Sequence, residues 1–223
     1  MPEHVFSRRQ FVRASSVAGA GFTIMPRHVF GGPKYRAPSD TLNVAHIGVG
    51  GMGRGDVQGM ANTGENIYAL CDVDDNQASS AWSAFPQAKR YRDFRVMLEH
   101  EAENIDAVVI STPDHTHAVA GMMALSLGKP TRIQKPLART MWEVQQLMSA
   151  AEVAGVATQM GNQGHAQEGT RQMREWYEAG AIGEILRVEY WTNRPIWPQA
   201  IHRPTDVHHV PPGLDWDLSL IHI

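Results

Sequence analysis

A glycine-rich turn between an apolar run and a helical pattern constrains this chain more than any other feature. Residues 42–47, Leu-Asn-Val-Ala-His-Ile, predict a buried parallel strand. The next six residues, 48–53, fit the pattern G-x-G-x-x-G, and we expect a helix to follow and to end near Asn62. A strand, a glycine turn and a helix in this order favour a dinucleotide-binding α/β fold.

Each glycine of the turn has its own expected role. Gly48 permits the tight turn, Gly50 lets the backbone approach a pyrophosphate, and Gly53 lets the helix pack closely on the strand. Gly51 and Met52 lie between them, at the start of the helix. Because the first N–H groups of a helix have no partner within the helix, they can bind the phosphates.

A second apolar run, residues 67–71, ends at Asp72, which lies 19 residues after Gly53. An acid at this spacing is expected to bind the adenosine ribose. Asp74 and Asp75 follow, and no arginine is adjacent in sequence, so NAD is favoured over NADP. The alternative is a glycine turn in an α/β protein that binds no nucleotide, with Asp72 as a helix cap.

Strand and helix patterns alternate over the next ninety or so residues. Near-continuous apolar runs predict buried strands, and an apolar spacing of three and four residues predicts helices. The predicted strands are residues 105–110, 131–134 and 156–160, and the predicted helices are residues 118–127 and 141–154. The alternation predicts an α/β fold, a doubly wound parallel sheet of the Rossmann type, over residues 41–160.

Four segments together resemble the Gfo/Idh/MocA family of oxidoreductases. They are residues 48–53, the Ser-Thr-Pro-Asp-His-Thr-His loop at 111–117, Gln134-Lys135-Pro136, and residues 180–185, Gly-Ala-Ile-Gly-Glu-Ile. The resemblance covers about residues 41–217. It implies an NAD-binding domain followed by an α+β domain that binds substrate and forms dimers.

By this resemblance Lys135 is the catalytic lysine of the family's Glu-Lys-Pro motif, and Pro136 follows a cis bond. An ammonium group beside NAD can move a hydroxyl proton and polarise the developing carbonyl. Gln134 departs from the family, which usually has glutamate there, and so brings no charge. Without the resemblance, Lys135 would be interpreted as a solvated lysine after a strand.

The resemblance also assigns the remaining site residues. Thr112, Pro113 and His117 are expected to line the nicotinamide side, and His117 is a second catalytic candidate. Asn162, Gln134 and Lys135 are expected to bind the cofactor. The His115-Thr116-His117 sequence raises the alternative of a metal site, but no acid or histidine set follows at ligand spacing, so we expect no metal.

The N-terminal residues 1–40 resemble an export signal and a linker. Arg8 and Arg9 precede residues 14–26, which are uncharged and small or apolar, as in a twin-arginine signal. This predicts the twin-arginine translocase as a partner and a location in the periplasm or on the outer face of the membrane. A disordered basic terminus or an amphipathic helix is the alternative.

Charge and cysteine content exclude several classes. The 20 basic and 23 acidic residues give a net charge of −3, which is no footprint for binding nucleic acid. The single cysteine, Cys71, allows no disulfide within the chain. No apolar run has the roughly 18 residues that a membrane-spanning helix requires.

The C-terminal part is expected to be an incomplete second domain, residues 161–217. Residues 184–191 alternate as a half-buried strand should. Residues 218–223 match one reading frame of a sequencing-library adapter, so we expect a truncated chain with a non-native tail. The full-length protein is expected to be a homo-oligomer, and the fragment is expected to be inactive.

These features predict an exported, NAD-dependent oxidoreductase that acts on a sugar, cyclitol or related polyol. Because the periplasm supplies no soluble NAD, we expect a tightly held cofactor and a redox-neutral cycle. Two alternatives stay open. One is an enzyme that cleaves glycosides through transient oxidation, and the other is a non-catalytic NAD- or sugar-binding protein.

Overall fold

The computed structural model describes residues 36–196 and 198–220. The chain divides into two compact units, Met1–Leu42 and Asn43–Ile223. In the first unit the described part holds a short 3₁₀ helix, Pro38–Asp40. The predicted twin-arginine signal lies outside the described residues, and the following paragraphs concern the second unit.

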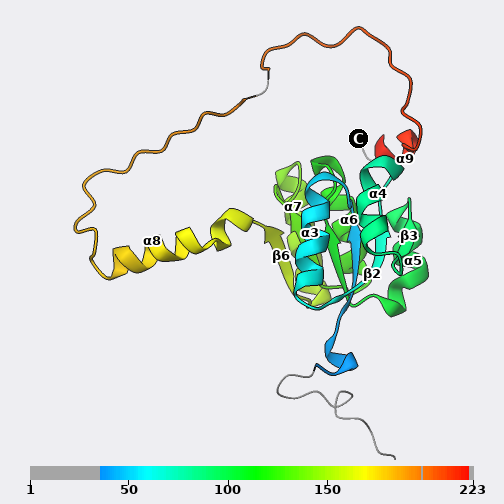
Figure 1. Cartoon of the computed structure of the whole chain (residues 1–223), viewed down its shortest axis with the longest axis horizontal. Coiled ribbons are helices and arrows are strands. Elements are labelled where there is room, and N and C mark those ends of the chain that lie inside the picture. Colours follow the sequence, from blue (N-terminus) through cyan, green and yellow to red (C-terminus); the bar gives the residue numbers. More distant parts are fainter. Residues whose placement is uncertain (1–35, 197, 221–223) are drawn as a thin grey trace, which may run out of the picture. The chain divides into compact units, whose positions relative to one another are not determined.

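Six parallel strands form one sheet in the order β3-β2-β1-β4-β5-β6, which confirms the predicted doubly wound fold (Figure 1). The winding reverses between β1 and β4, where such sheets bind ligands. The strands are β1 (Asn43–Ile47), β2 (Asn66–Cys71), β3 (Lys89–Tyr91), β4 (Ala107–Ile110), β5 (Thr131–Gln134) and β6 (Thr158–Gly161).

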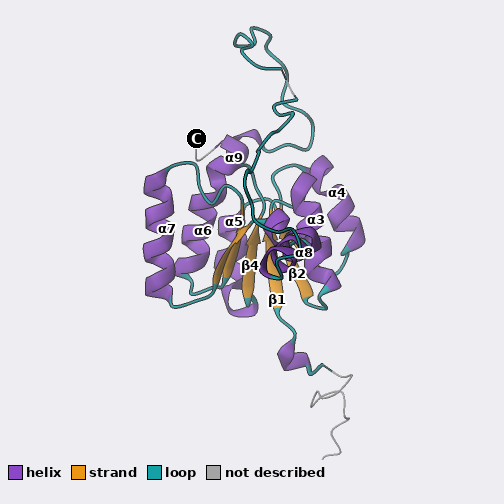
Figure 2. Ribbon diagram, turned by 90° about the vertical axis from the view of Figure 1, so that its left-hand side faces the viewer, coloured by secondary structure: helices purple, strands orange, loops and turns teal. Residues whose placement is uncertain are grey.

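Helices cover both faces of this sheet. Figure 2 shows α3 and α4 on one side of the strands and α5, α6 and α7 on the other, in agreement with the packing of these helices against one another. The helices are α3 (Gly51–Asn62), α4 (Asp75–Ala84), α5 (Phe94–Glu101), α6 (His117–Ser126) and α7 (Met141–Ala154), and the short 3₁₀ helices are η2 (Ala102–Asn104), η3 (Asp114–Thr116) and η4 (Gln163–Ala166).

Two hydrophobic cores lie on the two faces of the sheet. Successive strand residues point to opposite faces, so Ala69 and Cys71 join one core and Leu70 joins the other. The larger core includes α5, α6 and α7 through residues such as Leu98 and Leu147. Cys71 is buried, and burial raises the pKa of its thiol, so it acts as a packing residue.

The sequence patterns found most elements but missed residues 75–101. Here the structure has α4, β3 and α5, which complete the half of the sheet beyond β2. Aspartate side chains begin both helices: Asp74 accepts hydrogen bonds from the backbone of Asn76 and Gln77, and Asp93 accepts one from Arg95. These N-cap residues are the sequence signal that marks both helices.

A buried carboxylate joins β2, β3 and α5. Glu101 accepts hydrogen bonds from the Tyr68 and Tyr91 hydroxyls, both at 2.6 Å, and from Lys89 Nζ at 2.7 Å. The Lys89 ammonium, and then the two tyrosines, lower the pKa of Glu101 to about 2. This network fixes the edge of the sheet that carries the end of β3.

Beyond β6 the chain forms α8 (Glu168–Glu178) and α9 (Trp216–Leu220), joined by a long irregular segment. The predicted strand at residues 184–191 is wrong, because those residues have no strand structure here. A strand needs a neighbour for its backbone hydrogen bonds, and the described residues offer this segment none. Within the described ranges, no helix is long and apolar enough to cross a membrane.

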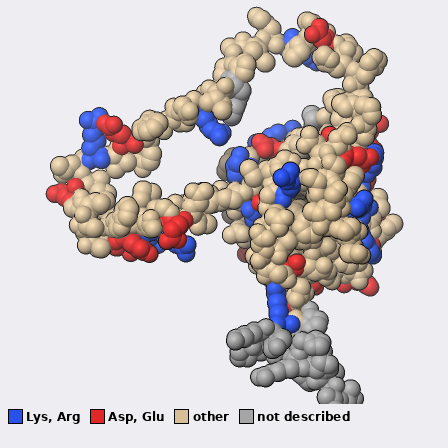
Figure 3. Space-filling model, viewed as in Figure 1, with Lys and Arg blue, Asp and Glu red and all other residues tan. Residues whose placement is uncertain are grey.

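Basic and acidic side chains lie among one another over the strand–helix body on the face that Figure 3 shows. Ion pairs within this body include Arg95 with Asp93 and Arg132 with Asp56. The surface charge is therefore mixed on that face, in keeping with the small net charge.

Candidate cofactor and active site

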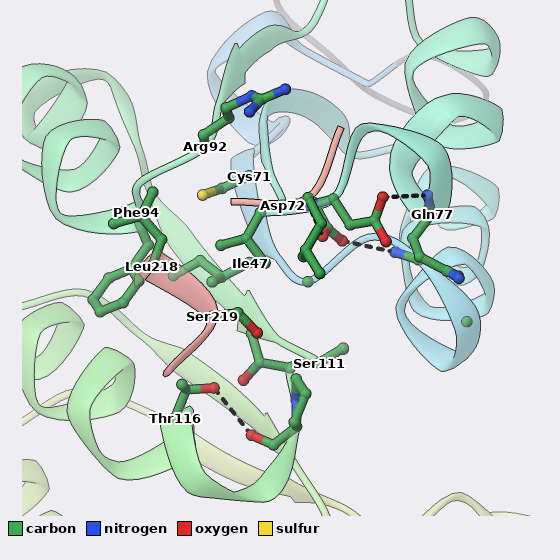
Figure 4. Close-up of a pocket in the computed structure, with 18 of the residues that line it drawn as sticks. Ile47, Cys71, Asp72, Gln77, Arg92, Phe94, Ser111, Thr116, Leu218 and Ser219 are labelled. Carbon is green, nitrogen blue, oxygen red and sulfur yellow. Dashed lines mark hydrogen bonds between the residues drawn. The ribbon is translucent and has the colours of Figure 1, made fainter. Parts of the chain in front are cut away.

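A crevice of about 390 Å³ opens at the carboxyl ends of β1, β2 and β4 (Figure 4). It has the position that ligands take in open α/β sheets and a volume typical of ligand sites. Seven of the predicted cofactor residues line it: Gly48, Gly50, Gly51, Met52, Asp72, Thr112 and Pro113.

The glycine turn forms the floor of this crevice. Gly48 has φ +78°, and a Cβ there would lie 2.8 Å from the backbone of Ser111 and Thr112. A Cβ on Gly53 would lie 2.0 Å from the Gly48 carbonyl oxygen. Only glycine therefore lets β1, the loop after β4 and α3 meet here, as the spacing predicted.

The start of α3 faces the crevice with its backbone N–H groups. Its N-cap residue is Gly50, which has no side chain to accept them. A Cβ on Gly50 would lie 2.7 Å from Gln77 Cβ, so the turn also packs closely against α4. An anion such as a pyrophosphate would supply the missing acceptors.

Asp72 at the end of β2 supports the glycine turn directly. Its Oδ2 accepts hydrogen bonds from the Val49 N–H at 2.8 Å and the Gly50 N–H at 3.1 Å, and its Oδ1 accepts one from the Asp74 N–H at 3.0 Å. A carboxylate can accept about four hydrogen bonds, so one position is left for a ribose hydroxyl. Asp72 thus shapes the turn as well as facing the crevice.

Arg92 lines the crevice from the end of β3, and no sequence pattern pointed to it. It is distant from Asp72 in sequence but forms an ion pair with Asp75, at the start of α4. No arginine is adjacent to Asp72 in the sequence, but the fold places Arg92 in the same crevice as Asp72. Its charge is already paired with a carboxylate, which reduces its attraction for a 2′-phosphate.

His117 is buried at the start of α6 and does not line the crevice. Its Nδ1 lies 2.7 Å from the Pro136 carbonyl oxygen, and its Nε2 lies 2.8 Å from that of Thr112. Both ring nitrogens are therefore engaged with backbone. This geometry does not suit direct proton transfer to substrate; instead His117 joins the loop after β4 to the loop after β5.

Lys135 follows β5 with an exposed side chain, and its peptide bond to Pro136 is cis, as the resemblance implied. Because β5 pairs with β4, Lys135 lies next to the loop that carries Thr112. Asn162 follows β6 and lies elsewhere, in a separate hollow that Arg132 and His165 also line. The structure does not bring Asn162 into the crevice.

Gln134 is buried in a polar cluster beneath the crevice. Its Nε2 donates to Asp56 Oδ2 at 2.9 Å, and its Oε1 accepts from the Lys135 N–H at 3.0 Å. Asp56 also accepts from Ser111 Oγ at 2.6 Å and pairs with Arg132 at 3.1 Å. Asp56 therefore fixes which way the Gln134 amide points, and the amide holds the backbone of Lys135.

His46 lies in β1 as a core residue. Burial lowers its pKa to about 4, so it is neutral at physiological pH. Within the described part of the chain, no group of three or more His, Cys, Asp or Glu side chains is placed to hold a metal ion.

Comparison with known proteins identifies this arrangement. Residues 42–162 match the family described as oxidoreductases with an NAD-binding Rossmann fold, Gfo/Idh/MocA. The chain belongs to the Gfo/Idh/MocA family. The match covers the whole sheet, from β1 to β6, and the glycine turn that forms the floor of the crevice.

Individual relatives agree with the family. Inositol 2-dehydrogenase of Salmonella typhimurium is 28% identical over 184 residues, which are 76% of this chain and 54% of that protein. A Shewanella pealeana protein of glycosyl hydrolase family 109 is 27% identical over 170 residues, 66% of this chain and 37% of that protein. The chain thus spans about half the length, or less, of these curated relatives.

Among solved structures, an oxidoreductase from Agrobacterium radiobacter in complex with NAD⁺, L-tartaric acid and magnesium is 25% identical. The two folds superpose with a TM-score of 0.60 over 65% of this chain and 42% of that one. NAD is the cofactor of this family's Rossmann domain.

The residues of this chain fit NAD. The glycine turn leaves a cradle that any Cβ would fill, and Asp72 has room for a ribose hydroxyl. Thr112 Oγ1 is buried at the crevice with no hydrogen-bond partner among the described residues. A bound carboxamide or ribose would satisfy it, since buried polar atoms are normally paired.

Asp56 places a carboxylate directly beside the Gln134 amide. We expect Gln134→Glu to lower the unfolding free energy by about 2 kcal/mol or more, because two buried carboxylates within hydrogen-bonding distance cannot both ionise. Adding Asp56→Asn restores one amide and one carboxylate, and so should recover much of the loss. Urea unfolding of the wild type, both single variants and the double variant measures this coupling. Strictly additive effects would contradict it.

Proposed function

We propose that this chain is the NAD-binding part of an oxidoreductase that acts on a CH–OH group of a sugar, cyclitol or related polyol. The observation that carries the proposal is the position of Lys135. It follows β5, beside the Thr112 loop that lines the crevice at the switch point between β1 and β4. The similarity to inositol 2-dehydrogenase supports the same class of substrate.

NAD, when bound, supplies the acceptor for the hydride of the substrate carbon. As the neutral amine, Lys135 would accept the hydroxyl proton at Nζ; as the ammonium, it would instead donate a hydrogen bond to the oxygen as the carbonyl forms. Thr112 Oγ1 and Asp72 hold the two ends of the cofactor, and His117 keeps the Thr112 loop and Pro136 in register. The site thereby brings a base to the substrate hydroxyl.

Export fits a tightly held cofactor. If the N-terminal signal directs the folded protein through the twin-arginine translocase, NAD must be loaded before export and regenerated in place. A redox-neutral cycle follows from this, such as a paired oxidation and reduction or an epimerisation. A complete substrate domain would supply the rest of the catalytic group and form the homo-oligomer.

The experiment is to purify the full-length protein without added nucleotide and to measure NAD released by acid. We expect close to one NAD per chain, and turnover of a polyol or sugar with little net NADH. Protein that lacks NAD and binds it with only micromolar or weaker affinity would contradict the retained cofactor. Such affinity corresponds to no more than about 8 kcal/mol of binding free energy.

A second function has one specific observation in its favour. The similarity to a glycosyl hydrolase family 109 protein supports cleavage of a glycosidic bond, through transient oxidation and elimination. Release of the aryl group from an aryl glycoside, without net NADH formation, would select this function. Slow or absent release, with oxidation of free polyols, would select the dehydrogenase.

A further inference from the structure

The segment Pro211–Asp215 lies against the loop that follows β2, far from it in sequence. Three hydrogen bonds join the two: Asp75 N–H to the Gly213 carbonyl at 3.0 Å, Asn76 Nδ2 to the Pro212 carbonyl at 2.7 Å, and Asp215 N–H to the Val73 carbonyl at 2.8 Å. Asp74 and Leu214 form an isolated antiparallel bridge between them. The segment is therefore docked by its backbone.

The docked segment also forms part of the cofactor crevice. Leu214 lines the crevice together with Asp72, Val73 and Asp74. The segment thus borders the crevice on the side of the loop after β2.

The docking requires glycine at position 213. Gly213 has φ +91°, and a Cβ there would lie 3.0 Å from Asn76 Nδ2 and 3.4 Å from Asp75 Cβ. Any larger residue is strained in this conformation and presses on the two residues that bind the segment. Docking can therefore be weakened without altering the glycine turn or Asp72.

We infer that Pro211–Asp215 is an additional part of the NAD site, which closes its adenosine end and slows release of the cofactor. The inference rests on the proposed function, in which NAD is retained. Asp72, the predicted ribose ligand, begins the loop to which the segment docks, so a bound adenosine would lie under Leu214. The apolar Leu214 side chain excludes water there. The hydrogen bonds to residues 211–215 restrict the motion of residues 72–76. NAD leaves readily only when these bonds open.

The experiment compares two variants of the full chain with a matched control. Gly213→Ala strains the docked turn. Asn76→Ala removes the bond to Pro212, while the Asp74 side chain still caps α4 because it accepts from the backbone N–H of residue 76. Gly183→Ala is the control, since Gly183 has φ +68° and open space around it. NADH release is followed by stopped-flow fluorescence after mixing with excess NAD⁺.

We expect both variants to release NADH about fivefold faster than wild type, the effect of losing roughly one hydrogen bond, and Gly183→Ala to match wild type. Hydrogen exchange should show the Asp215 amide protected in wild type and less protected in Gly213→Ala. Unchanged or slower release in both variants overturns the inference alone. An unprotected Asp215 amide in wild type also overturns it, and wild type that binds no NADH overturns the proposed function with it.

Discussion

Replacement of Lys135 by methionine is expected to lower the turnover number by about 10²–10⁴-fold, the usual contribution of a general acid or base. Methionine keeps the length of the aliphatic stem and removes the group that handles the proton. The Lys135 side chain is exposed and does not line the cavity that holds the glycine turn, so NADH affinity should stay within about twofold of wild type. Steady-state rates with a panel of cyclitols and sugars, and NADH titration, measure the two quantities.

The matched control is Lys129→Met, which removes a lysine from the loop before β5 at the opposite end of that strand. It should leave both quantities unchanged. If Lys135→Met retains the wild-type turnover, Lys135 is a solvated lysine. If the wild-type protein turns over none of the compounds in the panel, the non-catalytic alternative is supported.

Gly53→Ala is expected to cost about 3 kcal/mol of unfolding free energy and to abolish NADH binding. The new methyl group would meet the backbone carbonyl of Gly48, an atom that cannot move without displacing β1 from the turn. Either α3 shifts away from the strand, or the turn opens, and both changes destroy the cradle for the pyrophosphate. Urea unfolding and NADH fluorescence titration measure the two effects.

Gly55→Ala is a matched control in the same helix. Gly55 is exposed, and a Cβ there meets nothing within 4 Å. Alanine at this position should stabilise the chain by about 1 kcal/mol through helix propensity, with unchanged NADH binding. If Gly55→Ala lowered the unfolding free energy and NADH affinity as much as Gly53→Ala does, the close contact with Gly48 would not be the reason for glycine at position 53.

The prediction of the fold from sequence succeeded where local patterns and burial coincide. Apolar runs such as residues 67–71 favour burial in a sheet, and the predicted strand bounds agree with the observed ones to within a residue or two. The prediction failed where a strand would need a neighbouring strand that the described residues do not provide. Residues 184–191 alternate like a strand, but alternation specifies a face and not the neighbour that would pair with it.

The candidate site divides in a similar way. The glycine spacing requires close backbone approach at Gly48 and Gly53, because a Cβ is excluded at both, and this is a property of the local chain. Arg92, Asp56 and the Pro211–Asp215 segment reach the site from distant positions, and no local pattern marked them. Their roles depend on which strand ends the sheet order brings together.

The sequence by itself determined the fold class, the cradle for a dinucleotide and the place of Lys135 after a strand, since these follow from short-range sterics and periodicity. The tertiary structure alone decided that His117 joins two loops through its ring nitrogens and that Asp56 orients Gln134. It also brought residues 211–215 to the crevice. Hydrogen bonds between segments far apart in the chain form only after the sheet has set their distances, so they leave no trace in a local pattern.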